Sequence, residues 1–409
     1  MSRGLLREVP EQPGRRFPGQ YPPVQEPVPG QGHGPAVLHY NLSAAALNRS
    51  NVVAYILAGK RLDAAEEGDR ARRALLMEAL GYLYRAYSHK RRRLGPMAVL
   101  HPLRACALMA RAQETPRVES LLAVLFHDIQ EDVKPVDFEP REWRELEETL
   151  YEMLDRLPPG DEAGLVRRLQ ELTRIAGEPY TAYIGRLLEN AADGCPDLVE
   201  VKLADRLDNT LDMRIDLEDP LAGIDCFQHL FELLFVPHYP GYRPRSEHAP
   251  ATVMNGARRL HQLFKNAVLL SLIRQAPVLP ESAGRGALFD ALAQASLREA
   301  QRSLMHLLGY HLKDLGRQRA LVLDAMEYCH SGRSDLVTRP DGRRMLDGLF
   351  TIYFAPADGD RLRQQLDLLY ANKPLMVEGC IAFLVIFLSF LHDPAYYVRG
   401  IRAAGIEAS

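Results

Sequence analysis

Apolar residues recur every three and four positions along most of the chain after residue 41, a pattern typical of amphipathic helices. It is clear in the segments AAALNRSNVVAYILAGKRL and RRALLMEALGYLYRAY. No set of alternating β-branched strands bounded by turns interrupts the pattern, so the sequence predicts an all-α fold. Six further helices are predicted over residues 101–112, 118–131, 139–156, 162–175, 179–192 and 196–213.

Proline and glycine divide this helical chain into parts. Residues 1–40 are rich in both and are predicted to form a disordered tail. A first helical domain is expected over residues 41–236, followed by a linker and an extension helix over 237–275. Residues 276–409 are expected to form a C-terminal helical domain, for which the sequence indicates no role.

One segment of the C-terminal part, LMVEGCIAFLVIFLSFL from Leu375 to Leu391, is apolar enough to raise the question of a membrane span. It is barely long enough to cross a bilayer, carries Glu378 and stands alone. These features favour a buried core helix.

Composition and charge narrow the class of protein. A chain of 409 residues is longer than a single hydrophobic core usually accommodates. A content of 47% hydrophobic and 25% charged residues is ordinary for soluble globular proteins. A net charge of −3 gives no field that attracts nucleic acid or an anionic membrane, so neither is expected as a partner. The five scattered cysteines form no CxxC pair and the N-terminus has no apolar signal segment, which favours a cytoplasmic location. Nothing in the sequence indicates the oligomeric state.

The chemistry-bearing residues begin with HDIQED, residues 127–132, directly after the apolar run SLLAVLF. If one helix continues through this segment, His127 and Glu131 lie one turn apart, and so do Asp128 and Asp132. So much charge beside an apolar run is costly unless a cation compensates it. We therefore expect a divalent metal at this place.

Two more segments add donor atoms of the same kind. His101 begins HPLRACALMA, and VKLADRLDNT places Asp205 and Asn209 on one helix face. Two imidazoles and two carboxylates suit Mn, Mg, Fe or Zn and leave positions for water and a phosphate oxygen. Lys202 and Arg206 form a parallel basic pair, which could contact phosphate or lie on the surface; for Arg206 an ion pair with a carboxylate is the favoured interpretation.

Each motif is weak by itself. A lone helical histidine usually packs in a core, and a second His-Asp pair, His392 and Asp393, stands without companion motifs. The interpretation depends on the ordered set HP, HDxxED and KLADRxxN.

In this order the motifs resemble the hydrolase domain of the RelA/SpoT family, an HD-type metal-dependent domain that removes pyrophosphate from the 3′ position of guanosine tetra- and pentaphosphate. The similarity runs from about Leu75 to Met213 and is carried by RRRLGPMAVLHP, LFHDIQEDV, LVRRLQELTR and KLADRLDN. The first helical domain is therefore expected to be an HD phosphohydrolase domain that acts on a small nucleotide by attack of metal-bound water.

The resemblance also implies roles for single residues. A metal, manganese in that family, is expected on His101, His127, Asp128 and Asp205. Glu131 and Asp132 are expected to be the catalytic acidic pair. Substrate binding is implied for Arg92, Arg93 and Asn209.

The chain departs from the family around the nucleotide. Leu94, Met97 and Ala98 differ from the usual residues of the basic loop, Val133 replaces a threonine, and Asp208 replaces a histidine. Two alternatives therefore stay open. One is an HD-domain nucleotidase or phosphodiesterase for another nucleotide, and the other is a helical protein that senses a nucleotide without turning it over.

Overall fold

The computed structural model describes most of the chain after residue 66, and it shows an all-α protein, as the sequence predicts. The described residues are 56, 67–92, 97–113, 116–157, 159–212, 219–247, 255–276, 279, 282–331, 337–340, 343–356 and 358–406. The predicted tail over 1–40, most of the predicted helix over 44–62 and the candidate substrate residue Arg93 lie outside them.

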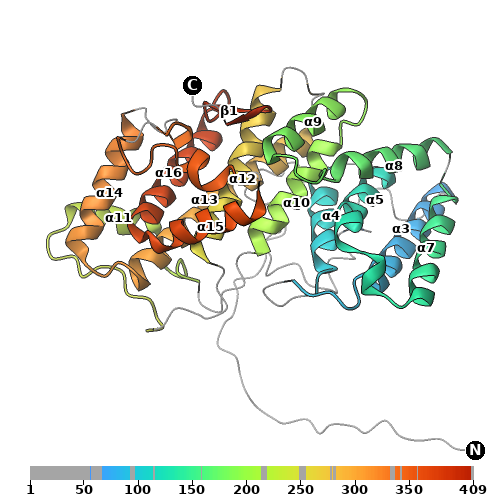
Figure 1. Cartoon of the computed structure of the whole chain (residues 1–409), viewed down its shortest axis with the longest axis horizontal. Helices are drawn as coiled ribbons and strands as arrows, with labels where there is room; N and C mark the ends of the chain where they lie inside the picture. Colours follow the sequence, from blue (N-terminus) through green and yellow to red (C-terminus); the bar gives the residue numbers. More distant parts are fainter. Residues whose placement is uncertain are drawn as a thin grey trace, which may run out of the picture. The chain divides into compact units, whose positions relative to one another are not determined.

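Helices of the first half carry the motifs (Figure 1). They are α3 (Glu67–Ala86), α4 (Leu100–Ala112), α5 (Val118–Phe126), α6 (Ile129–Asp132), the 3₁₀ turn Pro135–Asp137, α7 (Pro140–Leu154), α8 (Pro159–Leu172), α9 (Tyr180–Ala192) and α10 (Leu198–Asp212). Their bounds follow the predicted ranges closely, except that the range 118–131 is split in two.

The second half is also helical among the described residues. Its elements are α11 (Cys226–Phe235), α12 (Gly256–Gln275), α13 (Ala283–Tyr310), α14 (Leu315–His330), the π-helical turn Phe350–Phe354, α15 (Gly359–Ala371) and α16 (Lys373–His392). A two-stranded antiparallel hairpin of β1 (Ile401–Arg402) and β2 (Gly405–Ile406) follows, which the helical pattern did not predict.

Helix α10 runs between α4 and α13 and packs against both (Figure 1). Its apolar side chains, among them Val201, Leu203 and Leu207, are almost fully buried. The described residues belong to one compact unit, and buried side chains from both halves join one core. The division into an HD domain, a linker and a C-terminal domain stays a prediction.

Helix α16 contains the long apolar segment of the sequence. Among the described helices it is the one long and apolar enough to cross a membrane, and 72% of its apolar window is buried inside the protein. It packs against α13 and α14, and Phe383 and Phe387 are fully buried. This burial is what a core helix requires.

Candidate metal centre

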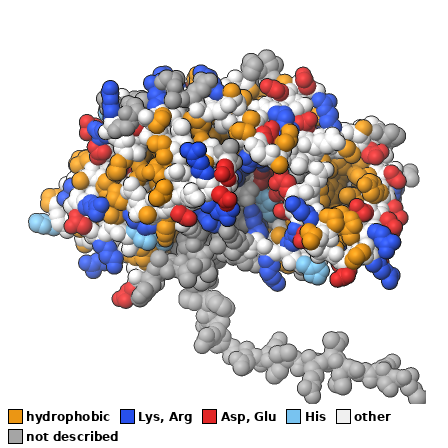
Figure 2. Space-filling view, viewed as in Figure 1, with side chains coloured by type: hydrophobic (Ala, Val, Ile, Leu, Met, Phe, Trp, Pro, Cys, Tyr) orange, Lys and Arg blue, Asp and Glu red, His pale blue; other side chains and the backbone are white. Residues whose placement is uncertain are grey.

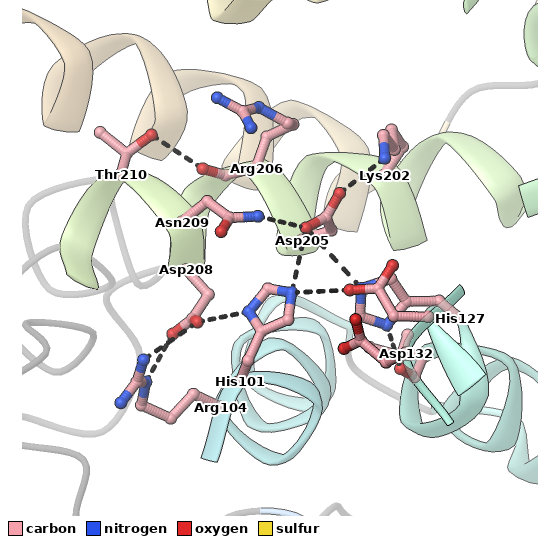
Figure 3. A network of polar contacts seen from close by, with 12 residues as sticks. His101, Arg104, His127, Asp132, Lys202, Asp205, Arg206, Asp208, Asn209 and Thr210 are labelled. Atoms are coloured by element: carbon pink, nitrogen blue, oxygen red, sulfur yellow. Dashed lines mark hydrogen bonds and ion pairs between the residues drawn. The ribbon is translucent and has the colours of Figure 1, made fainter. Parts of the chain in front are cut away.

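Four predicted ligands from separate parts of the chain come together at one point (Figure 3). His101 lies in the first turn of α4, Asp205 on α10, and His127 and Asp128 in the turn between α5 and α6. Each offers one ligand atom, and these atoms all lie within 4.8 Å of one another.

The donor atoms alternate between imidazole nitrogen and carboxylate oxygen. His101 Nε2 lies 3.3 Å from Asp128 Oδ2 and 3.2 Å from Asp205 Oδ1. His127 Nε2 lies 3.1 Å and 3.7 Å from the same two oxygens. Neighbouring ligands that each sit about 2.1 Å from one ion are separated by about 3 Å, so the ring fits one cation after small side-chain adjustments.

The turn that carries His127 and Asp128 corrects one prediction. The helix does not continue from 118 to 131, because α5 ends at Phe126 and α6 begins at Ile129. In an unbroken helix the Val124 carbonyl would accept from the Asp128 amide. Here it instead accepts from the His127 ring nitrogen Nδ1 at 2.7 Å, and the His127 amide approaches it at 3.5 Å.

This local contact also sets the chemistry of His127. With Nδ1 donating to the Val124 carbonyl, the neutral ring presents the lone pair of Nε2 to the cluster. That Nε2 atom is buried and makes no hydrogen bond within the described residues. A buried ring nitrogen without a hydrogen bond, surrounded by two carboxylates, fits a bound cation.

His101 is oriented by a buried carboxylate that the sequence did not single out as functional. Its Nδ1 lies 2.7 Å from Asp208 Oδ2, so Nε2 faces the cluster. Arg104 donates to the same carboxylate through Nε at 2.6 Å and through a terminal nitrogen at 3.1 Å. A carboxylate behind a ligating histidine fixes the ring orientation and raises its basicity.

Asp205 is held by two neighbours on its own helix. Lys202 Nζ lies 2.7 Å from Oδ2, and the Asn209 amide donates to Oδ1 at 2.6 Å. Arg92 donates in turn to the Asn209 side-chain oxygen at 2.6 Å and lies 3.4 Å from Asp208. Arg92 therefore contacts both Asn209 and Asp208, the residues that hold Asp205 and His101 in place.

The two carboxylate ligands favour positive charge at the histidines. Burial alone would lower the pKa of His127, but Asp128 and Asp205 raise it to about 9. The pKa of Asp128 is lowered although burial opposes this, because both imidazoles lie beside it. The pKa of Asp205 is lowered against the same opposition of burial, chiefly by Lys202. A cation would take the place of the imidazole protons.

A cavity of about 530 Å³ opens onto the cluster. Two ligands, His101 and Asp128, contribute to its wall, so an ion held there would be accessible to a small molecule. The remaining lining residues are mainly basic or polar: His89, Lys90, Arg91, Arg92, Ala98, Asp132 and Asn209. This lining suits an anionic ligand.

The structure separates the two predicted catalytic acids. Asp132 lines the cavity and receives a 3.4 Å hydrogen bond from Tyr87. Its pKa is raised by burial and by Asp128. Glu131 is exposed and accepts from the backbone amide of Arg174 at 3.1 Å, and it does not line the cavity.

The two basic residues of α10, Lys202 and Arg206, have different partners. Lys202 faces the cluster, whereas Arg206 donates to the Asn266 side-chain oxygen and to the Gln262 carbonyl on α12. The favoured interpretation of Arg206 as a partner of a carboxylate is wrong, because both acceptors are neutral amide oxygens.

On the face shown in the space-filling view, basic and acidic side chains are interspersed among apolar ones (Figure 2).

Comparison with known proteins adds no relative: no protein-family model, no curated protein and no solved structure matches the chain. The case for function therefore depends on the site itself.

Proposed function

We propose that the protein is a metal-dependent phosphohydrolase of the HD type that acts on a nucleotide. The observation that carries the proposal is the ring of two imidazole nitrogens and two carboxylate oxygens within 4.8 Å of one another. A divalent cation bound there would acidify a water molecule and draw charge from phosphoryl oxygens. The N and O donor set, without thiolate, suits manganese among other hard or borderline cations.

The residues around the cavity support phosphate chemistry. Lys90, Arg91 and Arg92 line the cavity and can neutralise phosphate groups, and Arg can do so through paired hydrogen bonds. Asp132 lies on the same cavity, and its pKa is raised by burial and by Asp128, which favours the uptake of a proton by this carboxylate. We assign proton transfer to Asp132 and a positioning role to Glu131, because Glu131 supports the loop at Arg174.

The favoured substrate is a guanosine tetra- or pentaphosphate that loses its 3′-pyrophosphate. The support for this substrate is the resemblance of the motifs to the RelA/SpoT hydrolase domain. Another nucleotide is the second candidate, because Ala98, which lines the cavity, and Asp208, which contacts the lining residue His101, depart from that family.

The test is product release from guanosine tetraphosphate and from a panel of nucleoside mono- and polyphosphates, with manganese present. We expect pyrophosphate release from guanosine tetraphosphate to exceed release from the other nucleotides. The variant Asp128→Ala should lose turnover while its thermal melting remains cooperative. If Asp128→Ala hydrolysed at the parent rate, the enzyme proposal would be abandoned, and nucleotide binding without turnover would favour the sensor.

A further inference from the structure

A row of cations and aromatic rings adjoins the metal cluster at Lys202 and extends from there to α9 and α12. Lys265 Nζ of α12 lies 5.5 Å from the ring centre of Tyr180 on α9. The Tyr180 and Tyr183 rings are 6.2 Å apart, and Lys202 Nζ lies 5.1 Å from the Tyr183 ring. Since Lys202 also pairs with Asp205, the row reaches a metal ligand.

The two lysines of this row have fewer carboxylate partners than their positive charges would require for compensation. Lys202 shares its one partner, Asp205, with both imidazoles. Lys265 has no carboxylate within ion-pair distance among the described residues, and its contact is the Tyr180 ring. Burial lowers the pKa of Lys265 to about 7, with Arg206 and Lys202 adding repulsion. Positive charge held in a partly buried place without a counter-ion is costly.

A hydroxyl donor in the same row is unsatisfied. The Oη atom of Tyr180 is buried and has no hydrogen-bond partner within the described residues. Leaving a buried hydroxyl unpaired costs about 1–3 kcal/mol, so an ion or an ordered water is expected to complete the hydrogen bonding of Tyr180. Because Lys265 Nζ lies 5.5 Å from the centre of the same tyrosine ring, an anion between the two side chains would pair with the ammonium and accept from the hydroxyl.

We propose that Lys265, Tyr180 and Lys202 form a subsite that binds a phosphate or pyrophosphate group beside the metal cluster. A phosphate group fits better than a carboxylate, because its several oxygens accept from more than one donor and its charge balances more than one cation. As a subsite for substrate or product, it rests on the phosphohydrolase function proposed above.

The experiment is calorimetric titration of the full-length, chelator-treated protein with inorganic pyrophosphate. Removing one ammonium should weaken binding at this subsite about tenfold or more, as a lost charge-assisted hydrogen bond does. We expect this loss in Lys265→Met and a smaller one in Tyr180→Phe, whereas Lys265→Arg should retain most of the affinity. The matched control is Lys313→Met, which removes an exposed lysine between α13 and α14 and should bind as the parent does.

Two further measurements distinguish this subsite from the basic cavity wall and from damage to the fold. Arg91→Gln is titrated with pyrophosphate in parallel, because the basic residues that line the cavity could bind the same anion. The affinity lost in this variant measures their share of the binding. Manganese affinity and thermal melting of Lys265→Met should equal those of the parent, which excludes a general loss of structure. The subsite is overturned if the parent does not bind pyrophosphate, or if Lys265→Met binds it as tightly as the parent.

The outcomes also distinguish the subsite from the proposed function. If Lys265→Met lost pyrophosphate binding but the parent cleaved no nucleotide, the subsite would stand and the phosphohydrolase proposal would fail. If the parent cleaved nucleotides and Lys265→Met bound pyrophosphate normally, the phosphohydrolase proposal would stand and the subsite would be rejected. Competition between pyrophosphate and guanosine tetraphosphate shows whether the group bound there comes from a nucleotide or from free anion.

Discussion

Replacement of Asp208 by asparagine tests how the site is built. The Asp208 carboxylate is 1% exposed and faces His101 Nδ1 and two nitrogens of Arg104, which is 5% exposed. Removing one partner of a buried ion pair costs about 3–5 kcal/mol, because the other charge is left uncompensated. Loss of the carboxylate behind a ligating histidine reduces metal affinity by about 10- to 100-fold. We expect both effects in Asp208→Asn.

A second substitution separates the two effects. Arg104→Met combined with Asp208→Asn removes the guanidinium that lost this carboxylate, so part of the lost stability should return. His101 still lacks its charged acceptor in the double variant, so manganese affinity should stay low. Stability is measured by urea unfolding in chelator, and metal affinity by calorimetry. Asp208→His, which installs the residue of the family that the motifs resemble, should also destabilise, because it removes the carboxylate that accepts two hydrogen bonds from Arg104. Parent-like stability and manganese affinity in Asp208→Asn would refute the positioning role.

Three other predictions follow from the same geometry. Manganese should bind more tightly, with release of protons, as pH rises from about 6.5 to 9, because the pKa of His127 is raised to about 9. In the metal-free protein, the stability contributed by the His127 proton is present below pH 6.5 and is lost above pH 9. A manganese affinity that does not change with pH in calorimetry would contradict this prediction. Asp132→Asn should lower kcat by about 10²- to 10⁴-fold and Glu131→Gln far less, and equal losses in nucleotide hydrolysis would reject the assignment. Asn266→Ala should destabilise the fold by about 3 kcal/mol, because the fully buried amide accepts from Arg206 and donates to Thr210 and Ser296; an unchanged urea midpoint would show that this network is unimportant.

Periodicity alone was sufficient to predict the helices and the all-α class. The ranges 101–112, 139–156 and 179–192 agree with α4, α7 and α9 to within two residues at each end. The break between α5 and α6 was not predicted, because it depends on a ring-to-carbonyl bond at His127 and not on hydrophobic pattern. The hairpin at the C-terminus was missed for a related reason, since strands of two residues are too short to show alternation.

The candidate site was predictable only in part. His101, His127, Asp128 and Asp205 could be predicted because their order along the chain resembles that of the RelA/SpoT hydrolase motifs, and the structure brings all four together. Asp208 was interpreted as a departure from the family, since nothing in one sequence shows that Arg104, on another helix, would lie opposite it. Lys265 and Tyr180 carry no motif at all, and their proximity results from tertiary packing of α9 and α12.

The four proposed ligands come from α4, the turn after α5, and α10, so about a hundred residues separate the first from the last. An unfolded chain cannot present these atoms together, so an ion bound by all four would act as a cross-link that exists only in the native state. Free metal at 100 times its dissociation constant would add about 2.7 kcal/mol to the free energy of unfolding. Resistance of the chain to proteases should consequently follow the supply of metal, whether or not a substrate is present.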